Sequence, residues 1–491
     1  MAGRLGDAGI SPVGSATFVL QSPMPSPSPN PLSRIPAVDK VLVALAKVGG
    51  LPPLPQPLVT DLVRREIAAM RQRVQAGEGR VGDFEETVAF IKERIEALYR
   101  SRIHPVINGT GVCIHTNLGR SPLAPAVAEA VSQVGRHYNN LEFDLESGER
   151  GKRGGFLERC LALLCEAPAA TITNNCAAAL ILILKHLAKG ECNEVIISRG
   201  ELVEIGGGFR VPEIMAVSGA KLVEVGATNK TSLEDYRRAI TPRTGLILKV
   251  HRSNFYIEGF VGEPSAEELV ALGAEHGLPV VEDLGSGAMV ATELLAPIPH
   301  EPTAAEVLKR GVDLVCVSGD KLCGGPQAGI IAGRAEVVAG IKKEPFFRAL
   351  RCDKLILAAM QETALAYLDA VATGERPDLP LLAMLAASVE DDLRPRGEAL
   401  LARLGTSELF SVGLVPTIAR CGGGTMPKAE IPSLALEIRP TQMKVPRLAG
   451  RLRDLPLPVV GYVEDDAFRL DLRTVFPEQD EALAAALLDV L

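Results

Sequence analysis

One stretch of the chain decides the fold, and it is residues 314–329, LVCVSGDKLCGGPQAG. A short apolar run typical of a buried strand leads into a glycine-flanked loop that carries Lys321. A lysine in such a loop is poorly placed to be a solvated surface charge, and an amine that is taken out of water becomes a nucleophile. We therefore interpret Lys321 as a lysine that forms a Schiff base. Ser318, three residues earlier, is a candidate hydroxyl for a phosphate site.

A second apolar run ends in a carboxylate, in residues 280–287, VVEDLGSG. An ionised aspartate that is buried without a partner is costly, so Asp283 should face a cation, and a protonated pyridine nitrogen is such a cation. The separation of Asp283 and Lys321 is one strand-helix-strand excursion, so the two can lie on nearby strands and reach opposite ends of one ring. The alternative is an aspartate that caps the following turn.

The third feature is residues 174–179, NNCAAA, which stand between a strand candidate and an apolar helix. The start of such a helix offers free N–H groups and the positive end of the helix dipole to a phosphate. Asn175, Cys176 and Ala177 are the candidate phosphate ligands, and the alternative is that Asn174 or Asn175 only caps the helix. A phosphate cup, a buried aspartate and a loop lysine together are typical of a pyridoxal-phosphate site.

Composition limits the class of protein. Of 491 residues, 47% are hydrophobic and 23% are charged, which is an ordinary globular mixture and excludes disorder over the whole length. The nine cysteines form no Cys-x-x-Cys pair and are not accompanied by clustered histidines, so we expect neither a disulfide framework nor a metal site.

We expect no membrane partner, because no uncharged apolar run approaches the ~20 residues of a membrane span. Residues 1–33 lack the pattern of a secretion signal and are expected to form a flexible Ser/Pro-rich tail of a cytoplasmic protein.

The pattern along the chain predicts four folded segments. Apolar residues at helical spacing predict a helical N-terminal domain over 34–83 and a connecting helix over 84–106. A mostly parallel α/β sheet covered on both faces is predicted within 107–377, and a small α+β domain within 378–491. The strand candidates of the larger domain are residues 170–173, 194–198, 221–225, 245–250, 279–282, 314–317 and 329–332.

Charge is unevenly distributed. The chain carries a formal net charge of −8, which at first argues against a nucleic-acid partner, and we expect no DNA partner. Basic residues nevertheless outnumber acidic ones between Arg34 and Arg80. A basic module on an acidic body suits contact with RNA phosphates. The alternative is that this module is only a soluble cap.

Several longer motifs make the chain recognisable. They are residues 107–111 (INGTG), 115–120 (HTNLGR), 138–144 (YNNLEFD), 199–207 (RGELVEIGG) and 318–321 (SGDK). Together they resemble the bacterial selenocysteine synthase family, the L-seryl-tRNA(Sec) selenium transferases. The likeness runs from about Ile35 to the C-terminus, and the Ser/Pro-rich tail has no counterpart.

The resemblance implies a type I aminotransferase-like fold, pyridoxal 5'-phosphate on Lys321 and a catalytic role for Asp320. It also implies that Arg120, Arg348 and Arg351 form an anion pocket for selenophosphate. The spacing of Arg348 and Arg351 agrees with one helix face, although two solvated arginines would show the same spacing. Only the resemblance brings in Arg120.

The implied reaction converts seryl-tRNA(Sec) to selenocysteinyl-tRNA(Sec). Lys321 removes the Cα proton, water leaves to give an aminoacrylyl intermediate with Asp320 relaying the proton, and selenium adds to the β-carbon. The N-terminal domain is expected to bind the tRNA. A homo-oligomer built from dimers, up to a decamer, is implied because type I enzymes share active sites across a dimer.

Two alternatives remain open. One is a pyridoxal-phosphate lyase that acts on a small amino acid or amino sugar without tRNA, and the other is a non-catalytic tRNA-binding protein on an inactive scaffold. His115 and His251 stay outside the catalytic set, because each is equally well explained as a hydrogen-bonded structural histidine.

Overall fold

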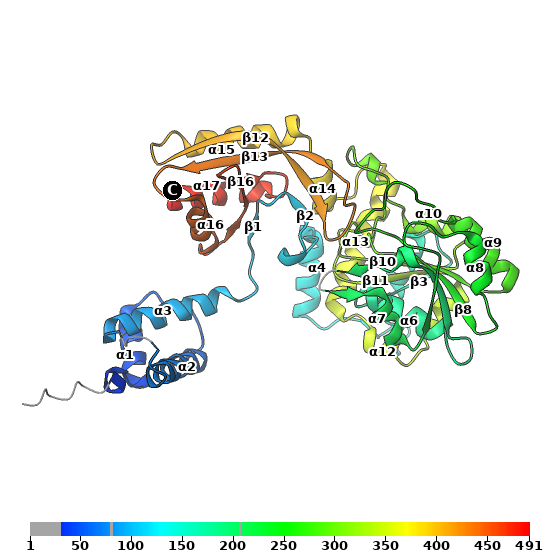
Figure 1. Cartoon of the computed structure of the whole chain (residues 1–491), viewed down its shortest axis with the longest axis horizontal. Helices are drawn as coiled ribbons and strands as arrows, with labels where there is room; N and C mark the ends of the chain where they lie inside the picture. The colour runs from blue at the N-terminus through cyan, green and yellow to red at the C-terminus, as the bar shows by residue number, and fades with distance from the viewer. Residues whose placement is uncertain (1–30, 79–81, 206–207) are drawn as a thin grey trace, which may run out of the picture. The chain divides into compact units, whose positions relative to one another are not determined.

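The computed structural model describes residues 31–78, 82–205 and 208–491, and the chain divides into two compact units, residues 1–104 and 105–491 (Figure 1). Most of the expected tail, together with Arg80 of the basic segment and the last two glycines of the 199–207 motif, lies outside the described residues. The end of that tail belongs to a short 3-10 helix, η1 (Pro31–Arg34).

The first unit contains three helices around one apolar core. They are α1 (Val38–Val48), α2 (Gln56–Gln75) and α3 (Phe84–Arg100). Buried side chains from all three helices form the core: Val41, Leu45, Val59, Val63, Ile67, Val88, Ile91 and Ile95. A capping box starts α3, in which Asp83 and Glu86 satisfy each other's backbone N–H groups. The helix expected to be a separate connector therefore belongs to the N-terminal unit, because its apolar face is part of this core.

The second unit is built around a seven-stranded sheet. Its strands, in spatial order, are β3 (Ala169–Thr173), β11 (Gly329–Gly333), β10 (Leu314–Ser318), β9 (Val280–Leu284), β8 (Thr244–Val250), β4 (Glu194–Ser198) and β7 (Lys221–Val225). Only β11 runs antiparallel to its neighbours. All seven strands expected from the sequence are present, which confirms the mostly parallel α/β sheet.

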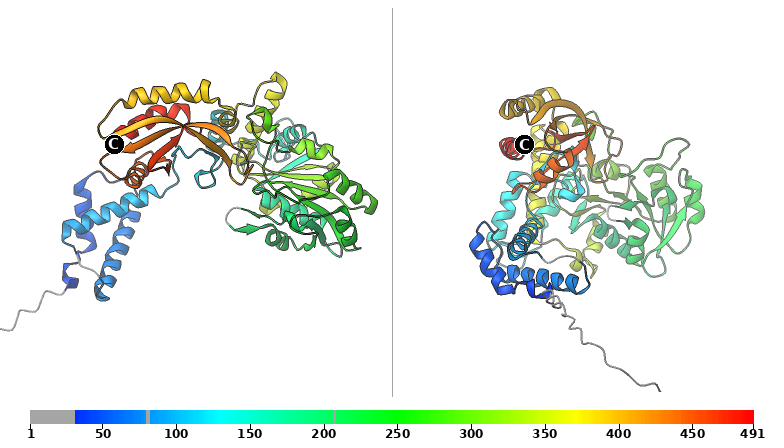
Figure 2. Two further views of the ribbon diagram at one scale, coloured as in Figure 1. Left: turned by 45° about the horizontal axis from the view of Figure 1, so that its top comes forward. Right: turned by 60° about the vertical axis from the view of Figure 1, so that its left-hand side comes forward.

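Helices cover both faces of this sheet (Figures 1 and 2). One face packs on α4 (Pro125–Arg136), α5 (Gly155–Leu164), α8 (Leu233–Ala239), α9 (Ala266–His276), α10 (Ala304–Lys309) and α13 (Lys354–Thr373). The other face packs on α6 (Cys176–Leu187), α7 (Val211–Ser218) and α11 (Ala335–Ile341). Because side chains alternate along a strand, Val315 and Val317 face the first set, whereas Leu314 and Cys316 face the second.

One helix of the described chain, α13, is long and apolar enough to span a membrane by length and composition. It packs against α4 and α5, and Leu357, Met360, Ala364 and Tyr367 are buried in the core on that face of the sheet. One face of α13 therefore belongs to the core, and 33% of its apolar window is buried.

The C-terminal part forms a second sheet of five strands. They are β15 (Tyr462–Glu464), β16 (Ala467–Asp471), β13 (Ile431–Pro440), β12 (Phe410–Gly422) and β2 (Val112–Ile114). Apolar side chains pack α15 (Arg394–Leu404), α16 (Val445–Arg453) and α17 (Asp480–Val490) on this sheet (Figure 2). Shorter elements complete the unit: β1 (Ile107–Asn108), which pairs with β14 (Val459–Val460), β5 (Glu204–Ile205), which pairs with β6 (Phe209–Arg210), α12 (Phe347–Leu350) and α14 (Pro380–Ala386).

The strands that pair with the C-terminal part show that the expected domain boundary at residue 107 is wrong. The segment over 107–114 was assigned to the catalytic domain, yet β2 pairs with β12 and β1 pairs with β14. Strands of two or three residues acquire their place only from such long-range partners. The sequence pattern also did not predict the long strand β12.

The turn after β9 requires glycine at position 287. Gly287 has φ +79°, and a Cβ there would lie 2.2 Å from the carbonyl oxygen of Ser318. We expect Gly287→Ala to lower the free energy of unfolding by about 1 to 3 kcal/mol or more. Thermal unfolding of the full chain followed by circular dichroism measures this. Gly148→Ala is the matched control, because its φ is +72° but its Cβ would meet nothing within 4 Å. Equal losses in the two variants would contradict the steric explanation.

Candidate active site

The edge of the large sheet brings Asp283 and Lys321 together. β9 and β10 are adjacent parallel strands, with Cys316 opposite Asp283, so their carboxyl ends meet at the same edge. Lys321 follows the end of β10 by three residues and is 7% exposed, and Asp283 is 6% exposed. The expectation that one strand-helix-strand excursion places these two residues on nearby strands is confirmed.

A pocket at this edge is lined by residues from six segments of the chain. It includes Arg120 after β2, His251 after β8, Asp283 in β9, Lys321 after β10, and the glycines that follow β12, Gly423 and Gly424. Other lining residues are Thr116, Val203, Val211, Val250, Ser253, Asn254 and Gly285. The seven-stranded and the five-stranded sheet therefore both contribute to it.

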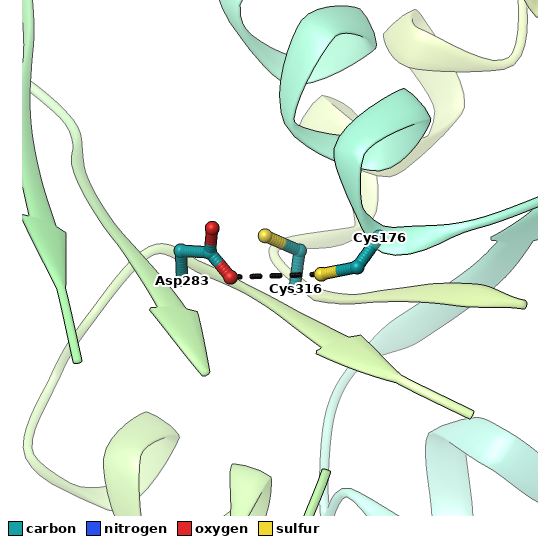
Figure 3. Close-up of side chains that lie close together, drawn as sticks. All are labelled: Cys176, Asp283 and Cys316. Carbon is teal, nitrogen blue, oxygen red and sulfur yellow. Dashed lines mark hydrogen bonds between the residues drawn. The ribbon is translucent and has the colours of Figure 1, made fainter. Parts of the chain in front are cut away.

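The carboxyl group of Asp283 is enclosed by two thiols (Figure 3). The Cys176 thiol at the start of α6 donates to Asp283 Oδ1 at 3.5 Å, and Cys316 on β10 lies alongside. Burial raises the pKa of Asp283, while the Cys176 hydrogen bond and the Lys321 charge act in the opposite direction. A carboxylate here is stable only beside a cation.

These three side chains also form a group with metal-ligating chemistry. The two sulfur atoms and a carboxylate oxygen of Asp283 lie within 4.8 Å of one another. The search of the sequence for Cys-x-x-Cys pairs missed this proximity, because the three residues come from distant segments. All nine cysteines are unpaired in the structure.

The Lys321 amine is held in a mixed electrostatic environment. Burial lowers its pKa and Arg120 adds to this effect, whereas Cys176, Asp283 and Asp320 act to raise it. The net direction is downward, so the neutral and nucleophilic amine is present at lower pH than in an ordinary lysine.

Arg120 and Asp320 form an ion pair beside the lysine. Arg120 Nη1 donates to Asp320 Oδ2 at 2.7 Å, and Asp320 is buried. Ser121 Oγ donates to the backbone oxygen of Lys321 at 2.7 Å. Arg120 has φ +64°, an unfavourable conformation for a side chain with a Cβ. Two neighbouring residues of the loop after β2, Arg120 and Ser121, thus bind two neighbouring residues of the lysine loop, Asp320 and Lys321.

The start of α6 fits both interpretations of residues 174–179, as a phosphate site and as a simple helix N-cap. Asn175 is the N-cap, and its side chain accepts from the Ala178 N–H at 2.8 Å. Cys176 and Ala177 are the first residues of the helix, whose N–H groups have no acceptor within the helix itself. Ser318 is buried at the end of β10 and, as far as the described residues show, does not line the Lys321 pocket.

Arg348 and Arg351 do not join Arg120 within this chain. They line a second pocket, together with Glu142, Arg150 and Arg153. The shared helix face expected for Arg348 and Arg351 is absent as well. α12 ends at Leu350, and Arg351 is its extended C-cap residue. Four residues make too short a helix for the i, i+3 relation to hold.

Sequence reasoning left out several residues of the Lys321 pocket. Ser253 and Asn254 follow β8, the strand next to β9, and that neighbourhood is the signal that could have identified them. His251 lines the same pocket, and its Nε2 lies 2.8 Å from the buried carboxylate of Glu301. His115 does not line it, and among the described residues its buried Nδ1 has no hydrogen-bond partner.

The lowered pKa of Lys321 gives a testable pH dependence. As pH rises through that pKa the amine loses its proton, so competitive acetic anhydride labelling of the cofactor-free protein should give a midpoint below 10.5 for Lys321. Arg120→Ala should move the midpoint upward, because it removes a positive charge and leaves Asp320 unpaired. Arg150→Ala, in the second pocket, is the control and should leave the midpoint unchanged. A midpoint at or above 10.5 in the unmodified protein would contradict this account.

The comparisons with known proteins agree with this geometry. The SelA family model, L-seryl-tRNA selenium transferase, matches residues 106–476. The L-seryl-tRNA(Sec) selenium transferase of Moorella thermoacetica is 45% identical over 472 residues, which are 94% of this chain and 98% of that protein. The protein of the same name from Geotalea daltonii is 44% identical over 93% of this chain and 99% of its own length.

A solved structure shows the same fold. D-glucosaminate-6-phosphate ammonia-lyase superposes with a TM-score of 0.54 at 21% identity, over 79% of this chain and 96% of that one. The aminotransferase-like α/β fold expected from the sequence is confirmed. With a family match over most of its length and relatives above 40% identity, the chain belongs to the L-seryl-tRNA(Sec) selenium transferase family.

Proposed function

We propose that this protein converts L-seryl-tRNA(Sec) to L-selenocysteinyl-tRNA(Sec), with selenophosphate as selenium donor and pyridoxal phosphate as cofactor. The observation that carries the proposal is the buried amine of Lys321 beside the buried carboxyl of Asp283 on the adjacent strand. The names of relatives that match nearly the whole chain support the substrate.

The residues at this edge of the sheet suit pyridoxal phosphate. Lys321 would bind its aldehyde carbon, and Asp283 would hold the proton of the ring nitrogen. The first N–H groups of α6, at Cys176 and Ala177, would receive the phosphate, with Asn175 capping the same turn and Ser318 as a further hydroxyl. When bound, the cofactor withdraws electrons from the Cα of the amino acid.

The chain's own groups supply the proton transfers. The Lys321 amine, whose pKa is lowered by burial, accepts the Cα proton of the esterified serine. Hydroxide is a poor leaving group, so the β-hydroxyl needs a proton, and Asp320 relays it. The ion pair with Arg120 keeps Asp320 oriented beside Lys321. The protonated β-hydroxyl leaves as water, the selenium of selenophosphate adds to the β-carbon, and a water molecule cleaves the Se–P bond so that phosphate is released.

The separation of the arginines supports a shared active site. Arg120 lines the Lys321 pocket, whereas Arg348 and Arg351 line the second pocket of the same chain. We propose that Arg348 and Arg351 bind the selenium donor for the active site of a second copy. The homo-oligomer is then built from dimers, and a decamer is compatible with this arrangement.

The N-terminal unit is the proposed tRNA-binding module. Exposed arginines of α2, among them Arg64 and Arg71, are seven residues apart and therefore share a face of the helix. A lyase for small amino acids would have no use for this unit. The reaction belongs in the cytoplasm, where charged tRNA is found.

The proposal predicts a defined product. Incubation of the protein with seryl-tRNA(Sec) and selenophosphate should give selenocysteine on the tRNA, and borohydride should fix the cofactor on the Lys321 peptide in mass spectrometry. Lys321→Ala should lose both signals, because no other amine replaces it. Lys309→Ala, an exposed lysine paired with Glu166, should keep both. Product formation by Lys321→Ala would refute the assignment.

The tRNA site has its own test. The core of the first unit includes α3, so deletion should remove residues 1–104, because a cut at residue 80 would strand the apolar face of that helix. The deletion should weaken tRNA binding and remove most of its salt dependence, while the absorbance of the lysine-bound cofactor survives. Reversal of charge at Arg64 and Arg71 should reduce the salt slope by about 0.7 to 0.9 per lost phosphate contact. Unchanged affinity after the deletion would place the tRNA site elsewhere.

A further inference from the structure

The second pocket contains a carboxylate held by three arginines. Glu142 accepts from Arg150 Nη2 at 2.9 Å, from Arg153 Nη1 at 3.1 Å and from Arg351 Nη1 at 3.4 Å. Arg153 is bound further by the backbone, because its Nη2 donates to the Cys352 oxygen at 2.6 Å. One glutamate therefore occupies the place where several guanidinium groups converge.

Positive charge in this pocket exceeds what its carboxylates neutralise. Six cationic and three acidic side chains line it. Two of those acids have partners of their own, since Glu158 binds Lys342 at 2.6 Å and Glu344 binds His186 at 2.7 Å. Among the described residues, no ion pair neutralises Lys152 or Arg348. Glu142 is thus the one carboxylate directed at the arginines.

Arg153 also has an unused donor. Its Nε is buried and has no hydrogen-bond partner among the described residues. A guanidinium edge of Nε and one Nη is the fork that binds carboxylates and phosphates through two parallel hydrogen bonds. In Arg153 the Nε–H group of this edge has no acceptor among the described residues.

We propose that Arg153 is a further ligand of the anion that Arg348 and Arg351 bind, and that Glu142 is the exchangeable counter-ion this anion displaces. The ligand class is a tetrahedral oxyanion, the phosphate group that selenophosphate and its product share. This inference rests on the proposed function, since it extends the anion pocket assigned there.

The physical basis is competition for the same N–H groups. The hydrogen bond from Arg153 holds the pKa of Glu142 below its usual range, so Glu142 stays ionised at neutral pH. A ligand must replace these contacts, and a doubly charged phosphate replaces them better than a singly charged anion. Glu142 therefore lowers the affinity of the pocket for weak anions, and it prevents mutual repulsion among the arginines when no ligand is bound.

Calorimetric titration of inorganic phosphate into the full-length, cofactor-loaded protein at low ionic strength tests the proposal. Glu142→Gln keeps the shape but removes the competing charge, and it should bind phosphate about tenfold tighter. Arg153→Lys loses the fork and should bind about tenfold more weakly than the unmodified protein. Arg348→Ala should weaken binding likewise, which assigns the measured heat to this pocket.

The matched control is Glu149→Gln. It makes the same charge change seven residues away, outside the lining of the pocket, and should bind phosphate like the unmodified protein. Cofactor absorbance and the midpoint of thermal unfolding verify that each variant is folded. If Glu142→Gln bound phosphate no tighter than Glu149→Gln, or if Arg153→Lys bound it equally well, the proposal would be overturned.

This experiment is independent of the test of the proposed function. Phosphate binding requires neither tRNA nor turnover. A protein that forms selenocysteinyl-tRNA but shows no effect of Glu142→Gln would lose only the present inference. A protein that responds as expected here but does not transfer selenium would lose only the proposed reaction.

Discussion

The site depends on a buried carboxylate and a buried amine at the end of two adjacent parallel strands. Asp283 and Lys321 are both buried, so ionising either of them costs desolvation free energy. Burial raises the pKa of the acid and lowers that of the amine, so it shifts both groups toward their neutral forms, and a ligand of opposite charge acts against that shift. A cofactor with an aldehyde at one end and a basic ring nitrogen at the other satisfies both groups at once.

Arginine-carboxylate pairs position the rest of the chemistry. Asp320 is paired with Arg120 beside Lys321, and Glu142 is paired with three arginines in the second pocket. Only in the second pocket does one carboxylate hold several guanidinium groups that would otherwise repel one another. The two carboxylates differ in burial, because the side chain of Asp320 is 10% exposed and that of Glu142 is 27% exposed. A fixed pair suits proton transfer, and an exchangeable pair suits anion binding.

Much of the fold followed from local pattern. Every expected strand of the large sheet is present, because strands buried on both faces must be apolar throughout. The same logic placed the carboxylate and the lysine at the ends of such strands. It failed for β2, which pairs with β12 hundreds of residues away, and for Arg351, which lies beyond the end of α12. Those positions depend on tertiary partners that no short window contains.

The sequence by itself determined the family and the sheet, because motifs and apolar runs are local features, and it placed Lys321 and Asp283 at the ends of buried strands. Only the tertiary structure decided which groups converge. It joined Cys176 and Cys316 to Asp283, brought His251 and Asn254 to the pocket, and separated Arg348 from Arg120. These side chains come together only because the ends of strands that are distant in the sequence lie side by side. The packing of the whole sheet decides which strand ends are neighbours, and no local preference does.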